Sequence, residues 1–222
     1  MKKLRLALCV AVFAAAAYGQ SVDAVLARMD QAAPRFRAME ADVQMTTYTA
    51  IIGDKTVENG TLKMQRVKSG EVRAIIDFSH QTDAREIAFL GKIIRIYYPN
   101  LNTYQDYDVG KNTEILNQFL LLGFGSSGKA LAQSYTITMA GTEKLAGQET
   151  TKLVLIPNDP KVKERLSKIE MWVPNNAAYP VQQQFYEPSG NYRLVTYLNI
   201  KINPSMRGTL ELKLPSGAKK QG

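Results

Sequence analysis

The residues of this 222-residue chain best suited to chemistry are a glycine-rich segment, one histidine and a few acids. The segment Gly123-Phe124-Gly125-Ser126-Ser127-Gly128-Lys129 matches all but the last position of a phosphate-binding P-loop. A P-loop follows a strand and ends in a hydroxyl that holds magnesium, but here a helix is expected first and Ala130 has no hydroxyl. We therefore interpret the segment as a hinge beside a mobile helix.

His80 is the only histidine, and no Gly-x-Ser-x-Gly motif accompanies it, so a nucleophile with a paired base is missing. Asp77, Asp83 and Glu86 could form a carboxylate cluster, but surface charge is the simpler interpretation. With one histidine and one cysteine, Cys9, the usual ligands of zinc or haem are lacking. We expect no enzymatic activity, no metal and no cofactor.

The N-terminus has the pattern of a signal peptide. Lys2, Lys3 and Arg5 precede the apolar run Leu6–Ala16, and Ala17-Tyr18-Gly19 is a small-x-small cleavage site. We expect residues 1–19 to be removed near Gly19 and residues 20–222 to form a single domain in the bacterial periplasm. Cys9 lies inside the leader, so the mature chain has no disulfide.

The mature chain is mildly basic, with 25 Lys and Arg residues against 20 Asp and Glu residues, a net charge of +5. The densest basic runs are Lys161–Lys168 and the tail, with Lys213, Lys219 and Lys220. The basic charge is either a solvated surface or a site of attraction for an acidic partner or anionic headgroups. Basic residues are not interleaved with aromatic ones, so we expect no binding to nucleic acid.

Hydrophobic periodicity predicts a mainly β domain. A helix begins after Ser21, and the strand Ala41–Ile51 then places Val43, Met45 and Ile51 on one face before a turn at Gly53-Asp54. Further strands are expected at Thr61–Val67, Val72–Ser79, Arg85–Leu90, Ile93–Tyr98, Thr103–Val109, Tyr135–Gly141, Glu149–Ile156, Lys168–Val173, Val181–Tyr186, Asn191–Ile202 and Leu210–Leu214. Ser126–Gln133 is a second short helix or a loop.

An antiparallel sheet of about ten strands must bury one face, and two helices cannot cover it. We therefore expect the sheet to curl into an unclosed β-barrel whose hydrophobic cavity is covered by a helical lid. The helix Thr113–Leu122 is more apolar than one core-facing stripe requires. Its candidate lid residues are Ile115, Leu116, Phe119 and Leu120.

Several short segments of the sequence resemble those of the LolA family of periplasmic carriers that sort lipoproteins to the outer membrane. The matching segments are Gly60–Arg66, Phe89–Lys92, Ile96–Asn100, Leu153–Pro157, Glu187–Gly190, Thr196–Asn203 and Leu214–Gly217. The resemblance implies an unclosed barrel that holds the acyl chains of lipoproteins. It also implies an inner-membrane ABC transporter as donor, an outer-membrane receptor as acceptor, and a role for Arg66 in opening and closing the lid. Val67 stands where the family usually has proline.

We expect a monomer that carries acylated lipoproteins or lipids. The cavity floor is predicted to consist of inward strand residues: Val72, Ala74, Ile76, Phe78, Ile87, Phe89, Ile94, Ile96 and Tyr98. Two alternatives remain open, a carrier of another envelope lipid or glycolipid and a lipoprotein-sensing regulatory domain of the same fold. An integral outer-membrane barrel is disfavoured by the helices in mid-chain and by the polar end of the chain.

Overall fold

The computed structural model of the chain describes residues 21–221 except 68–70, 79 and 81, without the side chains of residues 112, 114, 115, 118 and 119. The leader predicted at residues 1–19 lies outside the described residues. In the described part of the chain, no helix is both long enough and apolar enough to cross a membrane.

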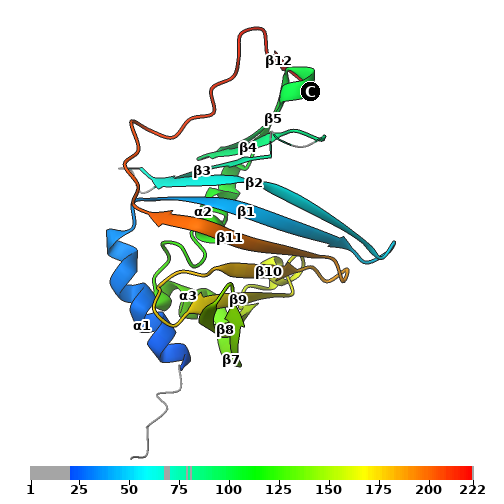
Figure 1. Cartoon of the computed structure of the whole chain (residues 1–222). Helices are drawn as coiled ribbons and strands as arrows, with labels where there is room; N and C mark the ends of the chain where they lie inside the picture. Colours follow the sequence, from blue (N-terminus) through cyan, green and yellow to red (C-terminus); the bar gives the residue numbers. More distant parts are fainter. Residues whose placement is uncertain (1–20, 68–70, 79, 81, 222) are drawn as a thin grey trace, which may run out of the picture.

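One sheet of twelve strands contains all the described strands, in the order β12-β6-β5-β4-β3-β2-β1-β11-β10-β9-β8-β7 (Figure 1). Every neighbouring pair is antiparallel except β12 and β6, and the edge strands β12 and β7 do not pair, so the barrel is unclosed. The strands are β1 (Ala38–Thr49), β2 (Asp54–Arg66), β3 (Val72–Asp77), β4 (Glu86–Leu90), β5 (Ile93–Tyr98), β6 (Thr103–Asp108), β7 (Tyr135–Leu145), β8 (Gln148–Pro157), β9 (Lys168–Pro174), β10 (Gln182–Tyr186), β11 (Tyr192–Ile202) and β12 (Lys219–Lys220).

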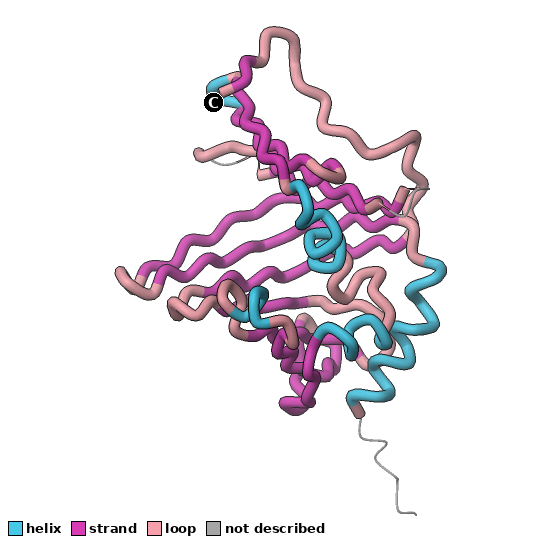
Figure 2. The backbone as a smooth tube through the Cα atoms, turned by 180° about the vertical axis from the view of Figure 1, so that it is seen from behind, coloured by secondary structure: helices cyan, strands magenta, loops and turns pink. Residues whose placement is uncertain are grey.

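The described helices are α1 (Val22–Ala32), η1 (Ala33–Arg35), η2 (Pro99–Leu101), η3 (Gly110–Asn112), α2 (Thr113–Leu120), α3 (Gly128–Ser134) and α4 (Pro160–Lys163). The longest of them, α1, α2 and α3, lie on one face of the sheet, which we call the inner face (Figure 2). The Ser21 and Ser127 hydroxyls cap α1 and α3 by accepting the N–H of Ala24 and Ala130. Apolar side chains of α1 and α3 then pack on β8 and β9 in a core centred on Leu153 and Met171.

The C-terminal segment covers the outer face of β3–β6. Leu212 is buried there against Ala88 and Tyr97. Because side chains alternate along a strand and the residues next to these two point to the inner face, Ala88 and Tyr97 point to the outer face. The strand predicted at Leu210–Leu214 was wrong, because this segment crosses the sheet rather than joining its ladder. Side chains provide the partners of its backbone, as where the N–H of Leu210 donates to Oε1 of Gln65 at 2.7 Å.

The first hairpin differs from the sequence-based expectation at its tip. The strand predicted to reach Ile51 ends at Thr49, and Ile51, expected on the core face, is 91% exposed in the turn before Gly53. β2 begins at Asp54, seven residues before the predicted start at Thr61. The first hairpin is therefore longer than predicted. The described residues form twelve strands, where about ten were predicted.

Candidate functional site

Two rows of apolar residues cross the inner face from β1 to β5. Each row is fixed by strand register, because residues paired across neighbouring strands point to the same side of a sheet. The first row runs Ala41, Leu62, Ile76, Ile87 and Ile96, and the second runs Met39, Met64, Ala74, Phe89 and Ile94. Six of the nine predicted floor residues thus lie side by side in two rows.

The remaining floor residues frame these rows. Val72 begins β3 and is buried in the same core, and Phe78 follows the end of β3 and is only 1% exposed. Tyr98 ends β5 and is half-buried. The rows also contain Met39, Ala41, Leu62 and Met64 of β1 and β2, which were not predicted as floor residues although apolar residues alternate along both strands.

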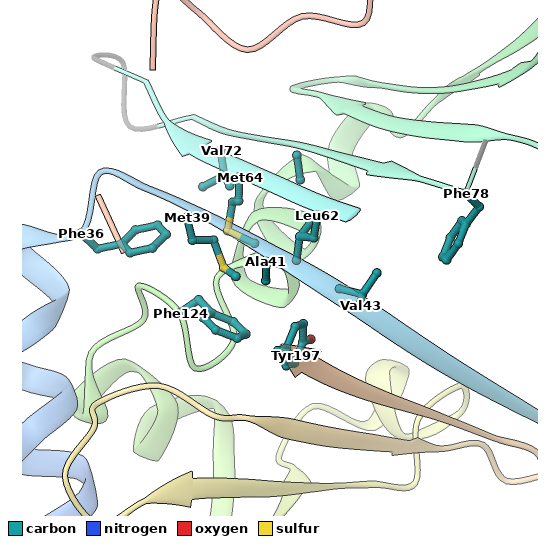
Figure 3. Close-up of a cluster of buried hydrophobic side chains, with 11 residues drawn as sticks. Phe36, Met39, Ala41, Val43, Leu62, Met64, Val72, Phe78, Phe124 and Tyr197 are labelled. Atoms are coloured by element: carbon teal, nitrogen blue, oxygen red, sulfur yellow. The ribbon is translucent and has the colours of Figure 1, made fainter. Parts of the chain in front are cut away.

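Burial decreases along both rows from β1 toward β5. Met39, Met64 and Ala74 are buried in one core with Phe124, and Figure 3 shows both methionines pointing toward its ring. Beyond them lies what we call the open apolar strip, whose members are half-buried: Ile76, Ile87, Phe89, Ile94 and Ile96. One half of the inner face is therefore covered, while the adjoining half keeps large apolar side chains partly in contact with solvent.

The cover over the buried half comes from α2 and from the segment that follows it, residues 121–127. Leu120 and Leu121 pack against the inner-face core, and Leu116 is half-buried. The side chains of the other two predicted lid residues, Ile115 and Phe119, lie outside the described residues. Phe124 was not predicted, although an aromatic residue between two glycines was a possible signal. Its ring meets that of Tyr197 edge-on, with 4.7 Å between centroids.

Arg66 ties this segment to the end of α1. Its guanidinium donates from Nη2 to the carbonyl oxygen of Gly125 at 2.7 Å and from Nη1 to that of Ala33 at 3.0 Å. It also lies over the ring of Phe36, 5.5 Å from the centroid. Burial lowers the pKa of Arg66, because removal from water disfavours the charged guanidinium. The two hydrogen bonds and the contact with Phe36 offset this cost.

A second tether holds the segment from the other side. The amide of Gln183, which is only 2% exposed, donates to the carbonyl oxygen of Leu122 at 3.2 Å and accepts from the hydroxyl of Tyr197 at 2.7 Å. Burial raises the pKa of Tyr197, which keeps this hydroxyl protonated and able to donate. Arg66 and Gln183 thus fix the two ends of the segment between α2 and α3.

Two hollows lie beside the cover. One, of about 200 Å³, is bounded by α1, the segment after α2 and the end of β11, with Met29, Phe36, Phe124, Tyr179 and Ile202 in its wall. The other, of about 420 Å³, includes Leu145, Tyr179, Val181, Leu198 and Ile200. None of the nine predicted floor residues lines either hollow. These floor residues therefore face the covering segment or solvent, and the two hollows lie elsewhere.

The residues first considered for chemistry are not assembled into a site. His80 is exposed in a turn, and Asp83 is exposed two residues before Arg85. Asp77 and Glu86 are cross-strand neighbours, and burial together with the charge of Asp77 raises the pKa of Glu86. Within the described residues, no three His, Cys, Asp or Glu side chains gather as metal ligands. The glycine-rich segment follows a helix and leads into the seven-residue α3.

No protein-family model matches the chain, and no curated protein sequence matches it. Among solved structures, a conserved uncharacterized protein from Thermus thermophilus matches with a TM-score of 0.54 and 13% identity, over 91% of this chain and 99% of that one. MucB matches with a TM-score of 0.50 and 14% identity, over 89% of this chain and 63% of MucB. A LolA superfamily protein from Nitrosomonas europaea matches at 0.39 and 12% identity, over 84% and 96%.

The unclosed sheet with helices on its inner face confirms the fold class that the sequence predicted, and the Thermus thermophilus protein and MucB share this fold. Identities of 13–14% extend this likeness to the fold alone. The floor, the lid and the role of Arg66 stay predictions about this chain.

Proposed function

We propose that the protein binds an acyl chain on the inner face of its sheet and carries the attached lipoprotein between the membranes of the envelope. The observation that supports this most strongly is the open apolar strip next to the covered core. Five large apolar side chains in register are left half-buried there. A soluble domain gains by covering such a surface, and an alkyl chain has the width and chemistry to do so.

The energies favour reversible binding. Burying one CH₂ stabilises by about 0.8 kcal/mol, so a chain of ~16 carbons gains roughly 10 kcal/mol. The cover gains less, because Leu120, Leu121 and Phe124 each contribute at most about 1.5–3 kcal/mol and the two leucines are only partly buried. An acyl chain that extends from the strip under the cover would displace these side chains, and their loss would offset much of its gain. A small net gain suits a carrier, which must release its cargo.

The segment after α2 packs closely against its neighbours at two glycines. Gly123 has φ +81°, and a side chain there would meet Pro180 and Met171, so the backbone runs close to its neighbours. Gly125 leaves room for Phe36 and Arg66. In our proposal, the hydrogen bond from Arg66 to Gly125 holds the closed state, and its loss lets Leu120 and Phe124 leave the inner face.

The route of transport rests on the predicted leader and on the resemblance to the LolA family. Export to the periplasm, receipt of cargo from an ABC transporter and delivery to an outer-membrane receptor all belong to this proposal, as does the absence of enzymatic activity. A carrier of another lipid or glycolipid, or a lipoprotein-sensing domain, would use the same inner face.

The proposal is tested by titrating the mature protein with a palmitoylated peptide that carries an environment-sensitive fluorophore near its acyl chain. We expect saturable one-to-one binding with a blue shift of the fluorescence, and no binding of the same peptide without palmitate. A protein that binds both peptides equally, or neither, would contradict an acyl-chain site.

A further inference from the structure

The turn of the first hairpin carries two exposed isoleucines. Ile51 is 91% exposed and Ile52 is 71% exposed, between Ala50 and Gly53. Turns of this kind normally use Gly, Asn, Asp, Ser or Pro, and the φ of +65° at Gly53 already supplies the required backbone geometry. The two isoleucines have almost no contact with the protein, so their burial does not explain them.

The hairpin projects from the body of the protein. β2 pairs with β3 only between Thr61 and Arg66, so the stretch Asp54–Gly60 extends beyond β3, by roughly 20 Å at 3.3 Å per residue. Figures 1 and 2 show this hairpin reaching past the neighbouring strands, with the turn between β10 and β11 close behind it. The isoleucines therefore occupy the outermost point of this end of the molecule.

A row of tyrosines lies directly behind the tip on the outer face. Strand register places five residues in one line across five strands: Lys55, Tyr48, Tyr192, Tyr186 and Lys168. The rings of Tyr48 and Tyr192 stack at 5.0 Å, and those of Tyr192 and Tyr186 lie 5.9 Å apart. The ammonium groups of Lys55 and Lys168 lie over the two outer rings, at 5.8 Å and 4.2 Å. We call this line the tyrosine row.

The basic run noted in the sequence lies at the same end of the sheet. It passes through α4 and ends where the N–H of Ser167 donates to the carbonyl oxygen of Tyr186 at 2.8 Å. Its exposed cations are Lys161, Lys163 and Arg165. Of the nearby acids, Glu58 pairs with Arg85, Glu187 with Arg193, and Glu170 with Lys152 and Lys168 of the tyrosine row. This leaves Asp54, Asp159 and Glu164 as the acids of the described residues at this end without a salt bridge.

We propose that this end docks on an anionic phospholipid bilayer, with Ile51 and Ile52 inserted among the acyl chains. Three features in sequence from the tip inward support the proposal. The tip is apolar, amphipathic tyrosines that suit the headgroup level follow it, and Lys55 and the exposed cations of the basic run can then meet lipid phosphates. Two isolated side chains at a projecting point are too small an area for a stable protein interface, but they suffice to enter a bilayer. This docking does not depend on what the inner face carries.

Sedimentation with vesicles of phosphatidylethanolamine and phosphatidylglycerol tests the proposal. The mature protein should bind, and it should bind less at high salt and less to phosphatidylcholine vesicles. Ile51→Ser with Ile52→Ser should reduce the partition constant at least about tenfold, because two large apolar side chains no longer enter the bilayer. Replacement of both by tryptophan should restore binding. The matched control Leu198→Ser, at a 44% exposed position further along β11, should bind like the parent protein.

Equal vesicle binding by the double serine variant would overturn the proposal, as would an absence of binding by the parent protein, which would favour a protein partner. Since Cys9 is the only cysteine and lies in the predicted leader, a single cysteine at position 51 can carry an environment-sensitive dye. Its emission should shift to the blue with vesicles, while that of a dye at position 198 should not. Ile76→Asp should leave this docking unchanged, so failure of the proposed acyl-chain site is distinguishable from failure of the docking site.

Discussion

Replacement of Ile76 with aspartate is expected to weaken the binding of a palmitoylated peptide at least about 100-fold. Ile76 lies between Leu62 and Ile87 in the first apolar row, where the covered core meets the open strip. An acyl chain laid on this row would desolvate the new carboxylate, which costs several kcal/mol without a partner, and each 1.4 kcal/mol lowers affinity tenfold. Since the position is half-buried, the unliganded variant keeps solvent at its carboxylate and should fold.

The matched control is Ile93→Asp. Ile93 lies in the same half of the sheet but points to the outer face, and it is 38% exposed. This variant should bind the peptide like the parent protein. Circular dichroism and thermal melts should show both variants folded. Parental affinity in a folded Ile76→Asp protein would mean that the acyl chain does not lie on this row.

Replacement of Arg66 with leucine is expected to loosen the segment that covers the inner face. The change removes the charged donors to the carbonyl oxygens of Gly125 and Ala33, and such bonds contribute about 1.5–3 kcal/mol each. The closed state should therefore open at least roughly tenfold more often. Hydrogen exchange can follow this directly, because the N–H groups of Phe124 and Ser126 both donate to the carbonyl oxygen of Leu121 in the closed segment.

Two comparisons separate lid opening from general destabilisation. Amides in β8, around the fully buried Leu155, should exchange at the parental rate in Arg66→Leu. Arg66→Lys keeps the positive charge but replaces the forked guanidinium with a single ammonium group. The rate of hydrogen exchange in the segment should therefore lie between those of the parent protein and the leucine variant. Unchanged exchange at Phe124 and Ser126 in Arg66→Leu would rule out a role for Arg66 in holding the cover.

The alternation in β3–β5 was readable from the sequence because these strands are short and because two residues alone join β4 to β5. The turn at Gly91, with φ +70°, pins the register of β4 against β5, and one register then sets the direction of every side chain in both strands. Ile76, Ile87 and Ile96 were thus correctly placed on one face from periodicity. The unclosed barrel followed from the same pattern, since a long antiparallel sheet with few helices must curl.

Other features of the candidate site left little or no trace in the sequence. The partners of Arg66 are backbone carbonyl groups. Every residue has a backbone carbonyl, so the sequence does not indicate which ones Arg66 contacts. The exposure of Ile51 was missed because alternation predicts a face but not where a strand ends. Asp54–Gly60 was not predicted as strand because polar residues and glycine have low β-propensity, yet pairing with β1 overrides it.

The most direct test of the central claim is native mass spectrometry of the mature protein purified gently from bacterial periplasm, with the bound material extracted and identified. Our account predicts a one-to-one adduct that contains an acyl chain and that is missing from the Ile76→Asp variant. A lipoprotein in the adduct would identify the cargo as proposed, and a phospholipid or glycolipid would keep the site but change the cargo. A protein that carries no adduct and takes up no palmitoylated peptide would contradict the account.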